Sequence, residues 1–512
     1  MFSMKQFSLR GFLTGVLGLL VITASSMYVA LRMGALPWPT VFVTVLSMVV
    51  LGHAKNVTLQ EINVTHTFMS SGAMVAGGLA FTLPGIWMVN PDAQIPFLTV
   101  LFITVSGAVL GTIFCSFYRK GLIESKSLVF PIGKAAYQTL KAGVKKGRYA
   151  FKLFTSMAFS IVFTVLRDVF SFIPPVFTLV HASSKIPQVN FWLSPMALAI
   201  GAVIDRLSAL CWFAGSIISY FILAPCGASE LFRQNLGIGL MIGTGAGILI
   251  KFVFRIIGKR GLVSVERRKE LLFGLASVVL IGILLPLFTE MNVLQGLLAV
   301  LLVGVSCLLC GMLTGQSGIN PMEIFGILVM LAVGFAGKTS VTGLFLVAAM
   351  TAVACGLSGD VMNDLKSGHL LRTDFRQQLF SELVGGVIGS VLSVIALFAM
   401  KKTFGNFGTE FLPAPQAKAV ASMATGLGNS VEFFAGIVIG TVLYITGLPS
   451  ATIGLGIYLP AQISLPVGMG ALVAIICKKS KKIKDEDISL VASGFLGGEG
   501  ISGVLIAIFS MF

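Results

Sequence analysis

Long apolar runs recur along this sequence from one end to the other, and they constrain the fold more than any other feature. Of its 512 residues, 56% are hydrophobic and 11% are charged, so no polar half remains that could fold in water as a separate catalytic domain. A helix needs about 20 residues to cross a bilayer, and roughly 30 with its connection. We therefore expect an all-α polytopic membrane protein with about 16 transmembrane helices, which excludes an enzyme held by a single anchor.

The basic residues are concentrated in a few connecting segments and are interpreted first as signals of topology. The net charge is +16, and 21 of the 36 Lys and Arg residues lie within residues 119–152, 251–270 and 478–487. Because Lys and Arg are enriched in cytoplasmic loops, these segments and the N-terminus are expected on the cytoplasmic side of the cell membrane. The basic charge is therefore not an indication of nucleic-acid binding.

An internal repeat divides the sequence near residue 260. Pro131 and Lys134 recur as Pro415 and Lys418, at an offset of 284 and within a shared Pro-x-x-Lys-Ala pattern. Five glycines then recur at an offset of 255, where Gly201, Gly215, Gly239, Gly243 and Gly245 correspond to Gly456, Gly470, Gly494, Gly498 and Gly500. The pattern predicts two membrane repeat halves, residues 1–260 and 261–512.

Charge indicates how the two halves are oriented. The basic segment 119–152 corresponds to residues 403–436, where Lys418 is the only basic residue. Equivalent loops are thus expected on opposite sides of the membrane, so the two pseudo-symmetric halves have inverted topology. Inverted repeats with helices broken by Gly and Pro are typical of alternating-access transporters, whose substrate sites lie at the breaks.

Two such breaks form the candidate substrate site. In residues 311–326, glycines and Pro321 interrupt an apolar run beside polar side chains, and a second break lies in residues 450–470. We expect the breaks to face each other and to hold a zwitterionic or chelated substrate, with basic side chains as charge partners. The candidate residues are Gln316, Ser317, Asn320, Glu323, Tyr458, Gln462, Arg167 and Arg206. The alternative for the first break is an ordinary loop with Glu323 at the membrane interface.

Ionisable residues inside apolar runs are candidates for holding a coupling ion, because a charge within the membrane is costly. Asp360 and Asp364 lie at i and i+4 on one helix face, where two ionised carboxylates repel each other and at least one favours its protonated form. His66 and Glu499 complete the candidates, because histidine titrates near neutral pH and Glu499 lies among glycines that allow close helix approach. The alternatives are a solvated helix end for the aspartates and a packing role for the histidine.

The local patterns of soluble catalytic sites are missing from this sequence, including G-x-x-x-x-G-K-[ST], H-E-x-x-H and G-x-S-x-G. Cys307 and Cys310 have the spacing of a metal or redox pair, but no second Cys or His pair is near them, so packing is the preferred interpretation. Residues 357–360 read Leu-Ser-Gly-Asp, whereas an intramembrane aspartyl protease needs Gly-x-Gly-Asp. We therefore expect no enzyme activity, no cofactor and no resident metal.

Six stretches carry a resemblance to a known family and follow that family's order along nearly the whole chain. They read MYVALRMGALPWPTVFVTVLSM, NVTHTFMSSGAMVAGGLAFTLPG, LVFPIGKAAYQTLKAG, GINPMEIFG, SGDVMNDLKSGHLLR and SGFLGGEGISGVL. The sequence resembles the oligopeptide transporter (OPT) superfamily, with GDxMxDLKxG and FPxGxA as the most specific combination. The NPG and KIPPR motifs of the fungal and plant peptide branch are absent, so it is more similar to the prokaryotic and yellow-stripe-like side.

The resemblance implies about sixteen membrane helices and secondary, proton-coupled uptake of small peptides or metal-chelate, siderophore-like compounds. It also places the Asn320-Pro321 break and the segment from Asp360 to Lys366 near the transport pathway. The expected partners are a small-molecule substrate, a coupling proton and the lipid bilayer, with a homo-oligomer left open. Two other classes stay open: a channel, which would conduct without accumulating substrate, and an intramembrane enzyme that acts on a lipid-linked substrate.

Overall fold

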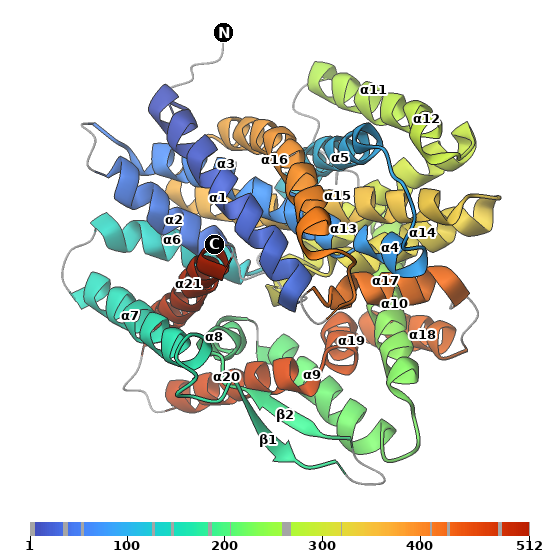
Figure 1. Ribbon diagram of the computed structural model, residues 1–512. Helices are drawn as coiled ribbons and strands as arrows, with labels where there is room; N and C mark the ends of the chain where they lie inside the picture. The colour runs from blue at the N-terminus through green and yellow to red at the C-terminus, as the bar shows by residue number, and fades with distance from the viewer. Residues whose placement is uncertain are drawn as a thin grey trace.

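The computed structural model describes residues 6–33, 39–52, 56–124, 128–144, 148–182, 187–204, 206–258, 268–318, 320–409, 412–426, 431–479 and 484–510. In these ranges the chain is almost entirely helical (Figure 1). Eight of the described helices are long and apolar enough to cross a membrane, and shorter apolar helices lie at Gly274–Thr289, Met322–Ala336 and Val431–Thr446. The predicted class, an all-α polytopic membrane protein, is confirmed. The count of about 16 crossings stays a prediction.

The described residues of the first part of the chain form ten α-helices, one π-helical segment and one two-stranded hairpin. Their bounds are α1 (Leu9–Met33), α2 (Pro39–Leu51), α3 (Leu59–Ala80), α4 (Pro84–Val89), α5 (Phe97–Ile123), α6 (Pro131–Val144), α7 (Arg148–Asp168), β1 (Val176–Val180), β2 (Val189–Trp192), α8 (Pro195–Val203), α9 (Arg206–Ile217), η1 (Ile218–Leu223) and α10 (Glu230–Gly258). The strands β1 and β2 are antiparallel and form the one sheet of the described residues.

The second part of the chain is helical throughout its described residues. Its helices are α11 (Arg268–Leu284), α12 (Pro286–Thr289), α13 (Val293–Ser317), α14 (Met322–Ala336), α15 (Val341–Leu371), α16 (Phe375–Phe404), α17 (Pro415–Gly426), α18 (Val431–Thr446), α19 (Ser450–Tyr458), α20 (Ala461–Lys479) and α21 (Asp485–Ser510).

Two long helices, α3 and α15, form the centre of the bundle. They pack on each other, and α1, α5, α13, α14 and α16 surround them (Figure 1). Gly78 allows the two backbones to approach, because a Cβ there would lie 2.6 Å from the backbone nitrogen of Val353. Every residue of α3 from Glu61 to Ala80 is buried.

Capping residues set the ends of the helices that carry the candidate site. Asn292 and Gln295 form a reciprocal capping box at the start of α13. That helix ends at Gly318, whose φ of 76° is the left-handed conformation that glycine adopts without strain. Ser340 caps the start of α15 by accepting a hydrogen bond from the Gly343 amide at 3.1 Å. Local sequence signals thus fix the break between α13 and α14.

Two apolar runs are each split into two short helices. The first is α8 followed by α9, and the second is α19 followed by α20. The breaks lie at Ile204 and at Leu459–Pro460, whereas Pro466 and Gly468 are accommodated inside α20. In Figure 1 these four helices lie in the lower part of the view together with the hairpin, below α3 and α15.

Close contacts between the short helices come in matched pairs. Gly201 on α8 lies against the α20 backbone at Val467, and Gly456 on α19 lies against the α9 backbone at Trp212. Gly201 and Gly456 are repeat partners at the offset of 255, and α9 and α20 are equivalent at the same offset. The contact of α8 with α20 therefore corresponds to the contact of α19 with α9 when the two halves are interchanged. The division of the chain into two repeats stays a prediction, which this pairing supports.

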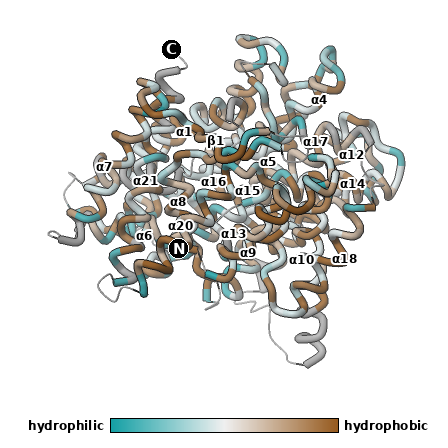
Figure 2. The backbone as a smooth tube through the Cα atoms, turned by 90° about the horizontal axis from the view of Figure 1, so that it is seen from below, coloured by the Kyte–Doolittle hydropathy of each residue, from teal (hydrophilic) through white to brown (hydrophobic). Residues whose placement is uncertain are grey.

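The surface of the described bundle is rich in large apolar side chains. Leu294, Leu301, Val438 and Ile476 are each more than half exposed. Figure 2 shows hydrophobic residues along most helices and hydrophilic ones mainly at helix ends and connections. Such a distribution suits helices that face lipid, because lipid chains cover apolar surface without penalty.

Candidate functional site

Three buried carboxylates meet where α15 packs against α16. Asp360 and Asp364 lie one turn apart on α15, and Glu382 comes from α16. One oxygen from each lies within 4.8 Å of the others, and the three residues are 3%, 0% and 0% exposed. The expectation that Asp360 and Asp364 share a helix face fits this geometry. Asp364 also lies at the contact of α15 with α3.

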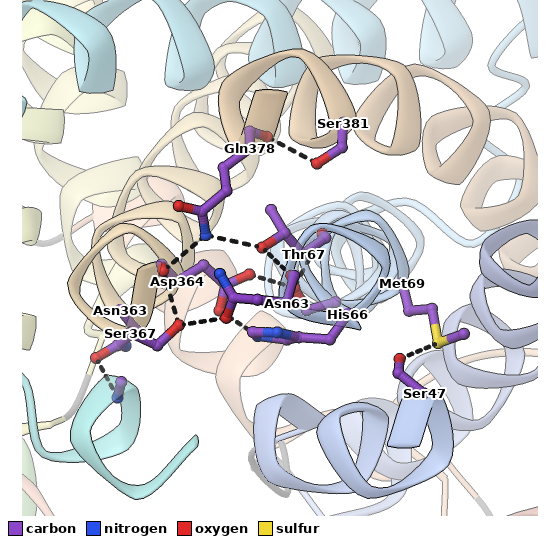
Figure 3. A network of polar contacts seen from close by, with 12 residues as sticks. Ser47, Asn63, His66, Thr67, Met69, Asn363, Asp364, Ser367, Gln378 and Ser381 are labelled. Atoms are coloured by element: carbon purple, nitrogen blue, oxygen red, sulfur yellow. Dashed lines mark hydrogen bonds and ion pairs between the residues drawn. The ribbon is translucent and has the colours of Figure 1, made fainter. Parts of the chain in front are cut away.

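Asp364 is held by two side chains of α3. His66 Nε2 lies 2.9 Å from Asp364 Oδ1, and Ser70 Oγ donates a hydrogen bond to Asp364 Oδ2 at 3.0 Å. His66 and Ser70 are one turn apart, so both face α15. Figure 3 shows the His66 ring pointing at the aspartate from α3. Both carboxylate oxygens of Asp364 thus have partners.

Further polar contacts hold these helices in register. Gln378 Nε2 on α16 donates to the Asp364 carbonyl oxygen at 2.8 Å, and Ser367 Oγ donates to Asn63 Oδ1 at 2.8 Å. Asn363 Oδ1 accepts a hydrogen bond from the backbone N–H of Gly133 at 3.2 Å, which ties α6 to α15. Figure 3 shows this network around Asp364. Four helices therefore fix the position of the carboxylates.

Glu382 differs from Asp364 in its surroundings. Neither of its carboxylate oxygens has a hydrogen-bond partner within the described residues, although the side chain is fully buried. Two ionised carboxylates 4.8 Å apart repel by about 3.5 kcal/mol at an effective dielectric constant of about 20. Burial adds a desolvation cost for each charge. Three ionised carboxylates at this spacing would therefore repel one another at a cost that protonation of one of them lowers.

The first predicted break is anchored by Asn320. Its Nδ2 donates to the carbonyl oxygens of Cys355 at 3.2 Å and Gly356 at 2.9 Å, and its Oδ1 accepts from the Cys310 thiol at 2.6 Å. The amide therefore satisfies backbone groups of α15 one turn before Asp360. Cys310 is buried beside this break, and packing stays the preferred interpretation of its role.

The remaining residues of this break lie around the ends of α13 and α14. Gln316 is half-buried near the end of α13, and the side chain of Ser317 lies outside the described part of the structure. Glu323 is buried in the first turn of α14. Its carboxyl interacts electrostatically with the Tyr458 hydroxyl, so the two breaks approach each other at this point.

The second break presents Tyr458 and Gln462. The Tyr458 hydroxyl donates to Gln416 Oε1 on α17 at 3.2 Å, and Gln462 is half-buried at the start of α20. The structure thus groups Glu323, Tyr458 and Gln416. Arg206 is exposed at the first residue of α9 and is not part of this buried group.

Arg167 and Glu499 form a separate buried ion pair between α7 and α21. Arg167 Nη2 lies 3.0 Å from Glu499 Oε1, and the same guanidinium binds both oxygens of Asp168 at 2.6 and 2.7 Å. Glu499 Oε2 accepts hydrogen bonds from Ser194 Oγ at 2.8 Å and from the Met196 amide at 2.7 Å, at the start of α8. Arg167, a candidate for the substrate site, is therefore paired with Glu499, a candidate for holding the coupling ion.

Glu382 is the residue of this site that the sequence interpretation missed. It is a single acid in a long apolar run, the kind of intramembrane charge that marks a functional position. The spacing of Asp360 and Asp364 could be read within one helix, whereas their contact with Glu382 depends on how α16 packs on α15. The position of Glu382 in an apolar run could have marked it as a candidate, but the sequence does not show that Asp360 and Asp364 lie beside it.

Comparisons with known proteins agree with this architecture. The family model described as OPT oligopeptide transporter protein matches residues 6–237 and 271–510. A Haemophilus influenzae protein whose name proposes that it is an oligopeptide transporter is 26% identical over 94% of this chain and 92% of its own length. Metal-nicotianamine transporter YSL2 of Arabidopsis thaliana and iron-phytosiderophore transporter YSL15 of Oryza sativa are each 31% identical over 28% of this chain and 25% of their own lengths.

Proposed function

The chain belongs to the OPT oligopeptide transporter family, and we propose that it is a secondary active transporter that moves small peptides or metal chelates together with protons. The observation that carries the proposal is the buried group of Asp360, Asp364 and Glu382, with His66 beside it. Ionisable side chains inside a membrane protein are costly and commonly serve ion or proton transfer. Multi-pass membrane insertion follows from the family and the apolar helices.

Coupling through this group follows from its charge. With His66 protonated, the pair with Asp364 is neutral, while Asp360 and Glu382 repel each other unless at least one of them holds a proton. Loading and release of that proton would therefore change the forces between α15 and α16. Glu499, the remaining coupling candidate, has two hydrogen-bond donors and Arg167 around it, so its contacts favour a structural role in this conformation.

The substrate would lie at the two helix breaks. The first break contributes Gln316, Ser317, Asn320 and Glu323, and the second contributes Tyr458 and Gln462. Glu323 and the Tyr458 hydroxyl lie near enough to interact electrostatically, which supports a shared site. Arg206 is an exposed basic residue for a substrate carboxylate, whereas Arg167 would first have to leave its acidic partners.

The substrate class rests on the relatives. The name of the Haemophilus relative points to peptides, and the names of the two plant relatives point to metal chelates of nicotianamine or phytosiderophore. Peptides and such chelates are small and carry several polar groups. The proposal therefore covers both, and transport without catalysis is part of it.

The transport cycle would exchange two repeat halves, residues 1–260 and 261–512, across the membrane. The matched contacts of Gly201 and Gly456 support this division. The basic segments place the N-terminus on the cytoplasmic side in this proposal, and a homo-oligomer is compatible with it.

Uptake into proteoliposomes tests the proposal. Purified protein is reconstituted, and a di- to tetrapeptide pool and an iron–nicotianamine pool are offered separately, with and without an inward proton gradient. We expect one pool to accumulate above its external concentration only when the gradient is present. Equilibration without accumulation would favour a channel, and accumulation that ignores the proton gradient would remove proton coupling.

A further inference from the structure

We propose that Glu382 is the residue that carries the coupling proton, with Asp360 as its neighbour, whereas Asp364 stays ionised and anchors the site. This inference rests on the proposed proton coupling and assigns the roles within it. The sequence indicated Asp360, Asp364, His66 and Glu499 for the coupling ion, whereas the packing of α16 indicates Glu382 as the proton carrier.

The first observation is the unequal surroundings of the three acids. Each oxygen of Asp364 has a hydrogen-bond partner, since His66 Nε2 lies 2.9 Å from Oδ1 and Ser70 Oγ donates to Oδ2. Such contacts stabilise the charged form of a carboxylate. Glu382 accepts no hydrogen bond within the described residues and is fully buried. Of the two, Glu382 is therefore the one for which the neutral, protonated form is favoured here.

The second observation is the side from which Glu382 approaches. Asp360 and Asp364 are fixed on α15, where Asn320 binds the backbone one turn before Asp360 and Gln378 binds the Asp364 carbonyl. Glu382 reaches them from another helix and brings no hydrogen bond of its own. Loss of its proton would place a third charge against α15, so α16 would be driven away from α15. The protonated state would hold the two helices together.

Within the described residues, no basic side chain pairs with Glu382 in place of a proton. Among the described residues, ionisable side chains on the four helices packed against α16 include Asp360 and Asp364 on α15, Glu61 and His66 on α3, Cys115 and Arg119 on α5, and Arg10 on α1. Lys366 on α15 donates to the Ile123 carbonyl oxygen, and Arg376 on α16 lies over the Phe375 ring. Arg10 pairs with Glu61, His66 pairs with Asp364, and Arg119 stacks on Phe375. The nearby cations are thus engaged elsewhere.

The proton transfer itself is simple. A hydronium ion on the loading side gives its proton to a carboxylate oxygen of Glu382, which forms an O–H bond and leaves a water molecule. After the helices rearrange, the O–H bond breaks toward a water on the other side, and Glu382 becomes ionised again. In the structure the side chain of Glu382 is fully buried, so this exchange with water requires the helices to move.

Infrared difference spectroscopy tests the protonation directly, without any substrate. Wild-type protein and Glu382→Gln are compared at neutral pH in detergent, with Glu230→Gln as the matched control because Glu230 is exposed in the first turn of α10. We expect the wild type and the control to show the C=O stretch of a protonated carboxyl, and Glu382→Gln to lack it. An unchanged band in Glu382→Gln would overturn the assignment, whether or not transport is proton-coupled.

Transport assays test the role of that proton. One pH unit of gradient supports about tenfold accumulation for each coupled proton. With the peptide and iron–nicotianamine pools as probes, Glu382→Gln should reduce accumulation to about onefold while counterflow exchange continues, and Glu382→Asp should restore part of it. Gradient-driven accumulation by Glu382→Gln at the wild-type level would overturn the proposal. Failure of the wild type to use the gradient would instead count against proton coupling itself. The infrared experiment tests the protonation of Glu382 independently of that result.

Discussion

His66 Nε2 on α3 lies 2.9 Å from Asp364 Oδ1 on α15, and neither side chain is exposed. The contact joins residues 298 positions apart and links the two central helices of the bundle. It also leaves Nδ1 of His66 without a hydrogen-bond partner among the described residues. A buried polar pair of this kind specifies how the helices register, and it is costly to break from one side only.

Replacement of Asp364 by Asn should destabilise the protein, because it leaves His66 buried without a charged partner. Removal of one partner from a buried pair costs about 3–5 kcal/mol. Thermal unfolding in detergent would measure the loss. His369→Ala, an exposed histidine on the same helix α15, is the matched control and should behave as wild type.

The double variant of His66→Ala with Asp364→Asn decides whether the pair acts as a unit. We expect the double variant to be less destabilised than the sum of the two single variants, since the second change removes a group that is already unsatisfied. Strict additivity of the two losses would show that His66 and Asp364 contribute independently and would contradict the account.

Replacement of Glu499 by Gln should destabilise the contact between α7, α8 and α21. Glu499 is 4% exposed and joins Arg167 to the start of α8, so its loss leaves the buried guanidinium with Asp168 as its remaining acidic partner. Asp487→Asn offers a matched control, because it removes a partly exposed ion pair with Lys152 between the same helices α7 and α21. The control should cost less than about 1 kcal/mol. Equal losses in the two variants would be inconsistent with the buried role of Glu499.

Replacement of Asn320 by Ala should loosen the break between α13 and α14. The change removes two hydrogen bonds to backbone carbonyls of α15 and leaves those groups buried, at a cost of about 1–3 kcal/mol. Uptake of whichever pool the wild type accumulates should fall together with thermal stability. Asn406→Ala, at an exposed position after α16, is expected to change neither property.

Close helix approach gives a prediction for the matched glycines. Leucine at Gly201 or at Gly456 would clash with the backbone of the facing short helix, so both variants should fold poorly. Gly121 has open space around its Cβ position, so Gly121→Leu is the tolerated control. The yield of monodisperse protein in detergent measures the effect. Normal yield for only one of the two matched variants would speak against an equivalent role in the two halves.

The class of fold and the helix breaks could be predicted from the sequence because both depend on local patterns. Apolar runs indicate membrane helices, and Gly318 with Pro321 sets the end of α13 and the start of α14. The shared face of Asp360 and Asp364 follows from helical spacing within one segment.

The partners of these residues could not be predicted in the same way. Glu382 meets Asp360 through the packing of two helices, and Glu499 meets Arg167 across more than three hundred residues of chain. Such contacts depend on the rotation and register of each helix, which a single sequence does not determine. Inside a membrane bundle, apolar residues cover every face of a helix, so hydrophobic periodicity does not show which side faces which neighbour.

The most direct test of proton coupling is to record substrate entry and internal pH together in the same proteoliposomes, with a pH-sensitive dye inside and no imposed gradient. The account predicts that addition of the transported pool acidifies the interior of vesicles with wild-type protein. Vesicles with Glu382→Gln should exchange substrate without acidification. Substrate entry into wild-type vesicles with no change of internal pH would contradict the central claim that protons travel with the substrate.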